Sequence, residues 1–334
     1  MTSTWPSNGG EDRSTFDSRN LAHEAFLRRR SFVRYLLEGS PPRIQVFDGQ
    51  DAEPGPRVTI IIPTDEYRSG NLECLLAQIK HQTFQRFEVV VVRGDRRQGR
   101  AINAAAAIAR GDILLTMDDD TRLGHDDLLE KIVAALTSDD TIGIAGVSNL
   151  VPADVSWLVR RAMHELPRRS SRLVTRVTDS DMAEHPCLAV RKEIFYRIGG
   201  ENELIPRGLD PYLRREVRRL GYRVVVIPNA WIHHLLPTTI RGILWQYFRN
   251  GMGSAYGKKF YPEFVVDQAL DHLREPTRDS TLPKRAFRYM RRLVIAVFTM
   301  RWIYLGTLVS YGLGYAWGMR SLKENFAVTS SRRP

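Results

Sequence analysis

Short apolar runs alternate with helical segments along residues 58–117, and this alternation constrains the fold more than any other feature. Three runs have the length of one buried strand each, at 58–62, 87–92 and 113–117. Helical patterns lie between them, at 72–81 and 101–109. Strands joined by two helical connections predict a parallel, right-handed βαβαβ unit. A further helix at 128–136 and a strand at 142–147 extend it into an α/β fold.

The third apolar run stops at three adjacent carboxylates, Asp118, Asp119 and Asp120. In α/β sheets, ligands bind outside the carboxyl ends of the strands. Three anions there repel one another unless they share a cation, and clustered carboxylate oxygens suit Mg²⁺ or Mn²⁺. Such a cation would in turn hold a diphosphate. The alternative is a solvated acidic turn that leads into a helix beginning near His125.

The βαβαβ unit favours a nucleotide ligand. Neither a Gly-x-Gly-x-x-Gly motif nor a Walker loop follows the first strand. This argues against a dinucleotide-binding Rossmann protein and a P-loop NTPase, and a nucleotidyltransferase usually has a glycine-rich loop at the same place.

The net charge of +11 is unevenly spread along the chain. Residues 1–150 hold 18 Lys and Arg against 22 Asp and Glu, or −4, whereas residues 151–334 hold 31 against 16, or +15. Nucleic acid and anionic membranes are the usual partners of a basic half. No helix-turn-helix, RRM or zinc pattern is present, so we expect no nucleic-acid partner.

The two cysteines form no CxxC pair, which favours a reducing compartment. Residues 1–17 are polar and lack the apolar core of a signal peptide. We therefore expect the catalytic body to stay in the cytosol.

Several motifs follow one another in a fixed order between residues 57 and 260. They are Val58–Thr64 ending in Pro-Thr, Gly99–Asn103, Met117–Asp120, Gly199-Gly200 with Gly208–Tyr222, and Pro228–His234. Their order and spacing resemble the family 2 glycosyltransferases, inverting enzymes with the GT-A fold. The resemblance implies a membrane-associated bacterial enzyme that uses a nucleotide-diphospho-sugar and Mg²⁺ or Mn²⁺.

The resemblance also implies roles for individual residues. Asp210 matches the aspartate of the family's Glu-Asp pair and would be the general base, while Asp120 and His234 would bind the metal. The donor-binding residues would be Pro63, Thr64, Glu66, Asp95, Arg100, Asn103, Asp118, Asp119, Gln246 and Arg249.

Two departures from the family pattern matter. The second strand ends in Arg93-Gly94-Asp95 instead of Asp-Asp-Gly-Ser, so Asp95 is left to contact the nucleobase. Leu209 replaces the glutamate of the Glu-Asp pair, and only Asp210 survives.

Asp210 is chemically suited to deprotonate an acceptor hydroxyl. Inverting transfer is one in-line displacement, so a single carboxylate base suffices. Pro211 suits a first helical turn, which places Asp210 at a helix start. The alternative is that Asp210 only caps the helix.

Two further side-chain pairs carry open alternatives. His233 and His234 would face opposite sides of a strand, and either could be the functional histidine. Gln246 and Arg249 would share one helical face, where an arginine can grip phosphate. The alternative for that stretch is an interfacial helix with aromatic residues at headgroup level.

Residues 293–317 form an apolar stretch broken only by Arg301. Its length would span a bilayer, but a central arginine costs about 2.5–3.5 kcal/mol on insertion. The competing prediction is a bent helical pair in the inner leaflet with Arg301 at the surface; a third is a buried helix of the fold. The basic segment 284–292 would lie on the cytoplasmic side, near anionic lipid.

We therefore predict a GT-A fold with a mostly parallel, Rossmann-like sheet and C-terminal amphipathic or membrane helices. The predicted division is a disordered N-terminus with an amphipathic helix at 21–37 and a linker (1–55), the glycosyltransferase domain (56–240), interface helices (241–292), a membrane segment (293–318) and a tail (319–334). The expected activity is transfer to a lipid-linked, polyprenyl-phosphate or surface-glycan hydroxyl at the cytoplasmic membrane face. The alternatives are a basic nucleic-acid-binding protein and a non-catalytic membrane scaffold.

Overall fold

The computed structural model describes residues 43–51, 55–64, 71–95, 97–266 and 282–323. The chain divides into two compact units. Unit 1 comprises residues 1–150, 172–201 and 213–235, and unit 2 comprises residues 151–171, 202–212 and 236–334. The helix predicted at 21–37 and the donor-binding Glu66 lie outside the described residues.

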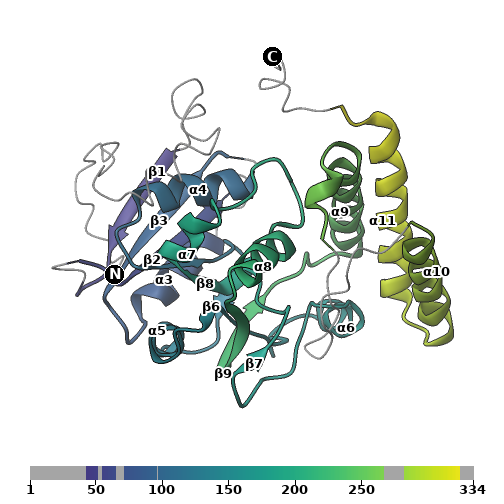
Figure 1. Ribbon diagram of the computed structural model, residues 1–334. Coiled ribbons are helices and arrows are strands. Elements are labelled where there is room, and N and C mark those ends of the chain that lie inside the picture. Colours follow the sequence, from purple (N-terminus) through teal and green to yellow (C-terminus); the bar gives the residue numbers. More distant parts are fainter. Residues whose placement is uncertain (1–42, 52–54, 65–70, 96, 267–281, 324–334) are drawn as a thin grey trace, which may run out of the picture. The chain divides into compact units, whose positions relative to one another are not determined.

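Unit 1 is built on one mixed sheet (Figure 1). Its order is β1-β3-β2-β4-β8-β6-β9-β5, and β7 pairs with β9. The strands are β1 (Arg43–Asp48), β2 (Val58–Thr64), β3 (Phe87–Arg93), β4 (Ile113–Thr116), β5 (Thr121–Leu123), β6 (Ile142–Asn149), β7 (Thr178–Asp179), β8 (Leu188–Arg191) and β9 (Arg223–His234).

The predicted βαβαβ unit is confirmed. Strands β3, β2 and β4 are adjacent and parallel, and Ile60 of β2 faces Val89 on one side and Leu115 on the other. Helices α3 (Asn71–Lys80) and α4 (Gln98–Ile108) form the two connections.

The remainder of the sheet is not mostly parallel. β8 pairs antiparallel with both β4 and β6, and β9 is parallel to β6 but antiparallel to β5. β8 follows a long connection through α6 (Trp157–Glu165) and the short 3-10 helix η1 (His185–Cys187), so it enters the sheet from the opposite end. The predicted α/β fold is therefore present, but the parallel order is confined mainly to the first half of the sheet.

Helices cover both faces of this sheet, which explains why its strands are apolar at consecutive positions. One core contains alternate strand residues such as Ile60 and Val89, together with the buried residues of α3 and α5 (Leu128–Ser138). The other contains Ile61 and Val90 with α4, α7 (Lys192–Arg197) and the body of α8 (Leu209–Arg219).

Unit 2 is helical, with α9 (Ile240–Phe260), α10 (Leu282–Phe298) and α11 (Trp302–Ser321) side by side, together with α6 and the 3-10 helix η2 (Pro262–Phe264). α9 and α11 are parallel and very close. A Cβ atom on Gly251 would lie 2.1 Å from the Tyr311 carbonyl oxygen, and one on Gly314 would lie 2.1 Å from the Phe248 carbonyl oxygen. Glycine at both positions is therefore what lets the two backbones touch.

The apolar stretch 293–317 is not one helix, because α10 ends at Phe298 and α11 begins at Trp302. Met300 between them has a φ of 53°. The Arg301 guanidinium donates to the Glu165 carbonyl oxygen, and the Glu165 carboxylate accepts from the Tyr304 N–H at 3.1 Å. The helical stretch is therefore bent into two helices, with Arg301 held by α6, and its location in a membrane leaflet stays a prediction. Among the described residues, no helix has both the length and the apolarity required to cross a membrane.

A buried ionic network fixes the amino-terminal edge of the sheet. Glu88 of β3 is buried and accepts hydrogen bonds from the Thr59 hydroxyl at 2.7 Å and from the Arg110 N–H and Nε, both at 2.6 Å. We expect Glu88→Ala to lower the free energy of unfolding by about 3 kcal/mol, because it leaves buried donors without their acceptor. The shift of the urea midpoint measures this.

A matched control is Asp112→Ala, which removes an exposed ion pair with Arg57 at 2.5 Å. Its expected cost is below about 1 kcal/mol. Equal destabilisation by the two variants would contradict the account of the network.

The two cysteines are predicted to differ sharply in reactivity. Cys74 on α3 is exposed, whereas burial raises the pKa of the Cys187 thiol to about 12. At pH 8 only about 10⁻⁴ of such a thiol is ionised, and the thiolate is the reactive form. We expect one thiol per native chain to react with a disulfide reagent, and the second only on unfolding. In native Cys74→Ser protein we expect no thiol to react with the reagent. Rapid reaction of two thiols in the native wild type would contradict the prediction.

Candidate active site

The side chains of Asp118, Asp120 and His234 converge just beyond the carboxyl end of β4. Each offers a ligand atom, and these atoms all lie within 4.8 Å of one another. His234 Nε2 lies 3.2 Å from Asp120 Oδ1 and 3.7 Å from Asp118 Oδ2. We call these three residues the acidic cluster.

Strand pairing brings His234 to this place. β5 directly follows the aspartates and pairs antiparallel with β9, so that Thr121 faces His234. The His234 N–H also donates to Asn149 Oδ1 at 3.0 Å. His233 points away, and its Nδ1 lies 2.7 Å from the Leu150 carbonyl oxygen. Of the two histidines, the structure brings His234 to the aspartates.

The acidic cluster fits a divalent cation. Two ligands at right angles around Mg²⁺, each about 2.1 Å away, would be about 3.0 Å apart, close to the 3.2 Å between His234 and Asp120. Two carboxylates and one imidazole suit Mn²⁺ or Mg²⁺. The side chains are half-buried, with exposed fractions of 23% for Asp118, 19% for Asp120 and 14% for His234, so solvent or a ligand can reach them.

Gln98, which the sequence analysis missed, touches the acidic cluster. Its Nε2 donates to Asp118 Oδ1 at 2.8 Å from the first residue of α4. The motif used to predict this helix start begins one residue later, at Gly99. In the sequence, Gln98 could have been found only as a polar residue at the start of the helix that precedes the aspartates.

Asp119 is turned into the protein. It is buried, and its Oδ2 accepts from the Thr64 hydroxyl at 2.7 Å, which ties the end of β2 to the loop after β4. Pro63 and Thr64 are the last two residues of β2. Asp119 therefore positions its two neighbours in the acidic cluster.

Asp95 and Arg100, both predicted to bind the donor, bind each other. The Arg100 guanidinium donates to the Asp95 carboxylate through Nε at 2.6 Å and Nη2 at 2.8 Å. Asp95 Oδ1 also accepts from the Arg97 N–H at 2.9 Å. This pair fixes the turn between β3 and α4, and the Asp95 side chain is fully buried.

Asn103 is fully buried and anchors a turn. Its amide donates to the Glu201 carbonyl oxygen at 3.0 Å and accepts from the Glu201 N–H at 2.9 Å. The turn needs Gly199 and Gly200, whose φ angles of 80° and 72° disfavour other residues. In the structure Asn103 therefore holds this turn, and its contact with the donor stays a prediction.

The remaining predicted residues belong to unit 2. Asp210 is half-buried in the first turn of α8, as the Pro211 signal predicts. Gln246 and Arg249 lie on α9. Gln246 Oε1 and Asn250 Oδ1, one turn apart, are buried and accept no hydrogen bond from the residues the structure describes.

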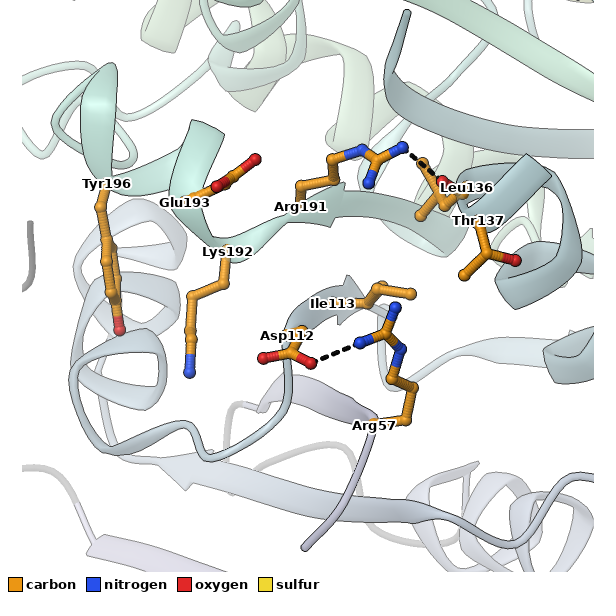
Figure 2. A pocket seen from close by; sticks show the side chains of 9 residues that line it. All are labelled: Arg57, Asp112, Ile113, Leu136, Thr137, Arg191, Lys192, Glu193 and Tyr196. Atoms are coloured by element: carbon orange, nitrogen blue, oxygen red, sulfur yellow. Dashed lines mark hydrogen bonds and ion pairs between the residues drawn. The ribbon is translucent and has the colours of Figure 1, made fainter. Parts of the chain in front are cut away.

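A cavity of about 450 Å³ lies at the opposite edge of the sheet, where β2 and β4 begin (Figure 2). Its cations are already engaged: Arg57 pairs with Asp112, Arg191 donates to the Leu136 carbonyl, and Lys192 donates to the Ala109 carbonyl. Burial also lowers the pKa of Lys192. We therefore place the candidate active site at the acidic cluster, where the possible metal-ligand atoms converge, and not in this cavity.

The comparison with known families decides the class of protein. Residues 52–199 match the model of the family described as Glycosyl transferase family 2. This stretch of the chain is similar to glycosyltransferase family 2 domains. The match covers β2, β3, β4 and the aspartate motif, and it makes the chain a glycosyltransferase.

A solved structure supports the fold. The mannosyltransferase PcManGT from Pyrobaculum calidifontis, in complex with GDP-Man and Mn²⁺, is similar with a TM-score of 0.51 and 16% sequence identity. The similarity covers 89% of this chain and 96% of the mannosyltransferase. It identifies the GT-A fold of this glycosyltransferase. No curated protein matches the chain at a significant level.

Proposed function

We propose that this glycosyltransferase moves a sugar from a nucleotide-diphospho-sugar to an acceptor hydroxyl, with inversion at the anomeric carbon and with the help of Mn²⁺ or Mg²⁺. The acidic cluster in a family 2 domain carries this proposal. The solved structure of PcManGT, with GDP-Man and Mn²⁺, supports a nucleotide sugar and a divalent cation.

Asp118, Asp120 and His234 would hold the cation. When bound, it would neutralise the charge that develops on the leaving nucleoside diphosphate. Gln98 donates to one oxygen of Asp118 and so orients that carboxylate. Asp119, held by Thr64, fixes the loop from which both carboxylates extend.

Asp210 is proposed as the general base. Its carboxylate would accept the proton of the acceptor hydroxyl as the oxygen attacks the anomeric carbon, and the bond to the diphosphate breaks on the opposite side. A helix N-terminus favours the charged carboxylate before the reaction. Gln246 and Arg249 are proposed to contact the diphosphate, where an arginine can form paired hydrogen bonds with phosphate oxygens.

The acceptor is proposed to be a lipid-linked, polyprenyl-phosphate or surface-glycan hydroxyl at the cytoplasmic face of the membrane. The excess of basic residues in the second half of the chain supports an acceptor site near anionic lipid.

A screen of nucleotide sugars tests the proposal. We expect one donor to raise the melting temperature in the presence of Mn²⁺ and not in EDTA, since a ligand at 100 times its dissociation constant adds about 2.7 kcal/mol of stability. Sugar transfer from that donor to a lipid extract should follow the same metal dependence. Stabilisation by no nucleotide sugar, or equal stabilisation in EDTA, would contradict it.

A further inference from the structure

Unit 2 carries the entire net charge of the protein. Its segments hold 21 Lys and Arg against 10 Asp and Glu, or +11, whereas the segments of unit 1 hold 28 of each. Such segregation marks unit 2 as the part that meets an anionic partner.

Unit 2 also exposes large aromatic side chains. Among the residues that the structure describes, four tryptophans are more than half exposed, and all belong to unit 2: Trp157 (74%), Trp245 (57%), Trp302 (56%) and Trp317 (59%). Tryptophan is usually well buried, but it is enriched where a protein meets the headgroup region of a bilayer.

α10 has an exposed apolar face opposite the face that it buries. Phe287, Met290, Val294 and Phe298 recur every three or four residues and are all exposed, while Ala296 on the other side is buried. Arg291 lies on the border of this face and is exposed. This is the pattern of a helix that lies in a membrane interface.

α11 repeats the pattern. Trp302, Val309, Leu313 and Trp317 are exposed at intervals of seven, four and four residues, so they form one stripe along the helix, and exposed Arg320 ends it. Tyr304 and Leu308 face the interior of unit 2.

The turn between α10 and α11 joins the two faces. Phe298 is 83% exposed, and Met300 and Trp302 beyond it are also exposed. The one charged residue of the turn, Arg301, is bound to the Glu165 carbonyl and stacks 5.0 Å from the Tyr304 ring. The turn is therefore apolar at its surface because its charge is held by α6 and α11.

We propose that the α10 face, the turn at 298–302 and the α11 stripe form one docking surface for an anionic lipid bilayer, into which Phe298, Trp302 and Trp317 insert to the level of the headgroups. The occupant follows from two complementary properties: the cations of unit 2 match lipid phosphates, and the exposed apolar side chains match the acyl boundary. Nucleic acid would match the cations and could stack on the aromatic rings, but it would leave the exposed aliphatic side chains Val294, Val309 and Leu313 in water.

This inference specifies how the membrane location in the proposed function is achieved, and it rests on that location. It does not require that transfer occur. Vesicle binding and Mn²⁺-dependent donor binding therefore report on the two proposals separately.

The test is co-flotation of the full-length protein at about physiological ionic strength. One set of vesicles contains phosphatidylcholine alone, and the other also contains roughly 30% phosphatidylglycerol, which supplies the anionic charge. We expect binding to the anionic vesicles. Trp302→Ser and Trp317→Ser should each weaken the partition about tenfold, because each removes a large apolar side chain from the interface. Arg291→Gln should weaken it about fivefold, in a salt-dependent manner.

Matched controls lie in unit 1. Leu220→Ser removes an exposed apolar side chain and Arg219→Gln an exposed cation, and neither should change vesicle binding. Equal loss in the control and test variants would overturn the proposal. So would a salt-dependent shift with DNA or RNA without vesicle binding, or a Trp302-dependent dimer in sedimentation that binds no vesicles.

Discussion

Replacement of Asp210 by asparagine should lower the rate of sugar transfer about 10²–10⁴-fold, which is the usual contribution of a general base. The amide keeps the shape of the side chain and can still occupy the first turn of α8, but it cannot take the acceptor proton. Donor binding in the presence of Mn²⁺ should be unchanged, because the carboxylate acts on the acceptor. Steady-state transfer rates and donor titrations of the same preparation measure the two effects.

Asp127→Asn is the matched control for the helix-start role of Asp210. Asp127 immediately precedes α5; its side chain makes no capping hydrogen bond but pairs with Lys131 of the first turn at 2.9 Å. Its replacement should cost at most about 1 kcal/mol of stability and leave transfer unchanged. If Asp210→Asn behaves like this control, with full activity and a small loss of stability, Asp210 only caps α8 and has no part in the mechanism.

Replacement of Asp120 by alanine should lower transfer on the order of 10³-fold, because the cation that stabilises the leaving diphosphate would lose a ligand. Unlike Asp210→Asn, this variant should also lose the Mn²⁺-dependent part of donor binding, and higher Mn²⁺ should restore part of the activity.

Asp126→Ala provides the control for Asp120→Ala. Asp126 is an exposed aspartate six residues along the chain, outside the acidic cluster. The transfer activity of the Asp126→Ala enzyme should match that of the wild type at every Mn²⁺ concentration. An Asp120→Ala enzyme with the metal dependence of the wild type would remove Asp120 from the metal site.

The sequence predicts the first half of the sheet well because its signals are local. Apolar runs as short as Ile113–Thr116 with helices between them leave little choice but parallel strands. In the second half the connections also contain helices, but they join strands that are antiparallel neighbours or not neighbours at all. β8 and η1 follow a long segment after α6, and nothing in Leu188–Arg191 itself indicates an antiparallel neighbour on either side.

In the site, too, local sequence patterns predict some residues, whereas others depend on partners far away in the sequence. A strand that ends in aspartates points to Asp118 and Asp120, and the alternation along β9 separates His233 from His234. The partners of Asn103 and Asp119 are not predictable in this way. Asn103 meets Glu201 98 residues along the chain, and Asp119 meets Thr64 55 residues before it. A polar residue in a motif can therefore be a positioning residue whose partner only the fold reveals.

Arg301 illustrates the limit of hydropathy arguments. In the sequence it is a charge inside an apolar stretch, which makes any membrane span marginal. In the structure its guanidinium meets the Glu165 carbonyl, 136 residues earlier, at a break between two helices. Arg301 therefore lies at a helix boundary, and hydropathy could not predict this because its partner belongs to α6, far away in the sequence.

Titration of Mn²⁺ into the wild-type protein and into Asp120→Ala, with a nucleoside diphosphate present and with free Mn²⁺ followed by electron paramagnetic resonance, tests the metal site most directly. The wild type should bind one ion per chain, and the variant should bind it at least about tenfold more weakly, since a lost ligand costs at least about 1.4 kcal/mol. Equal Mn²⁺ binding by the two proteins, or no binding by either, would contradict the assignment of the acidic cluster as the metal centre.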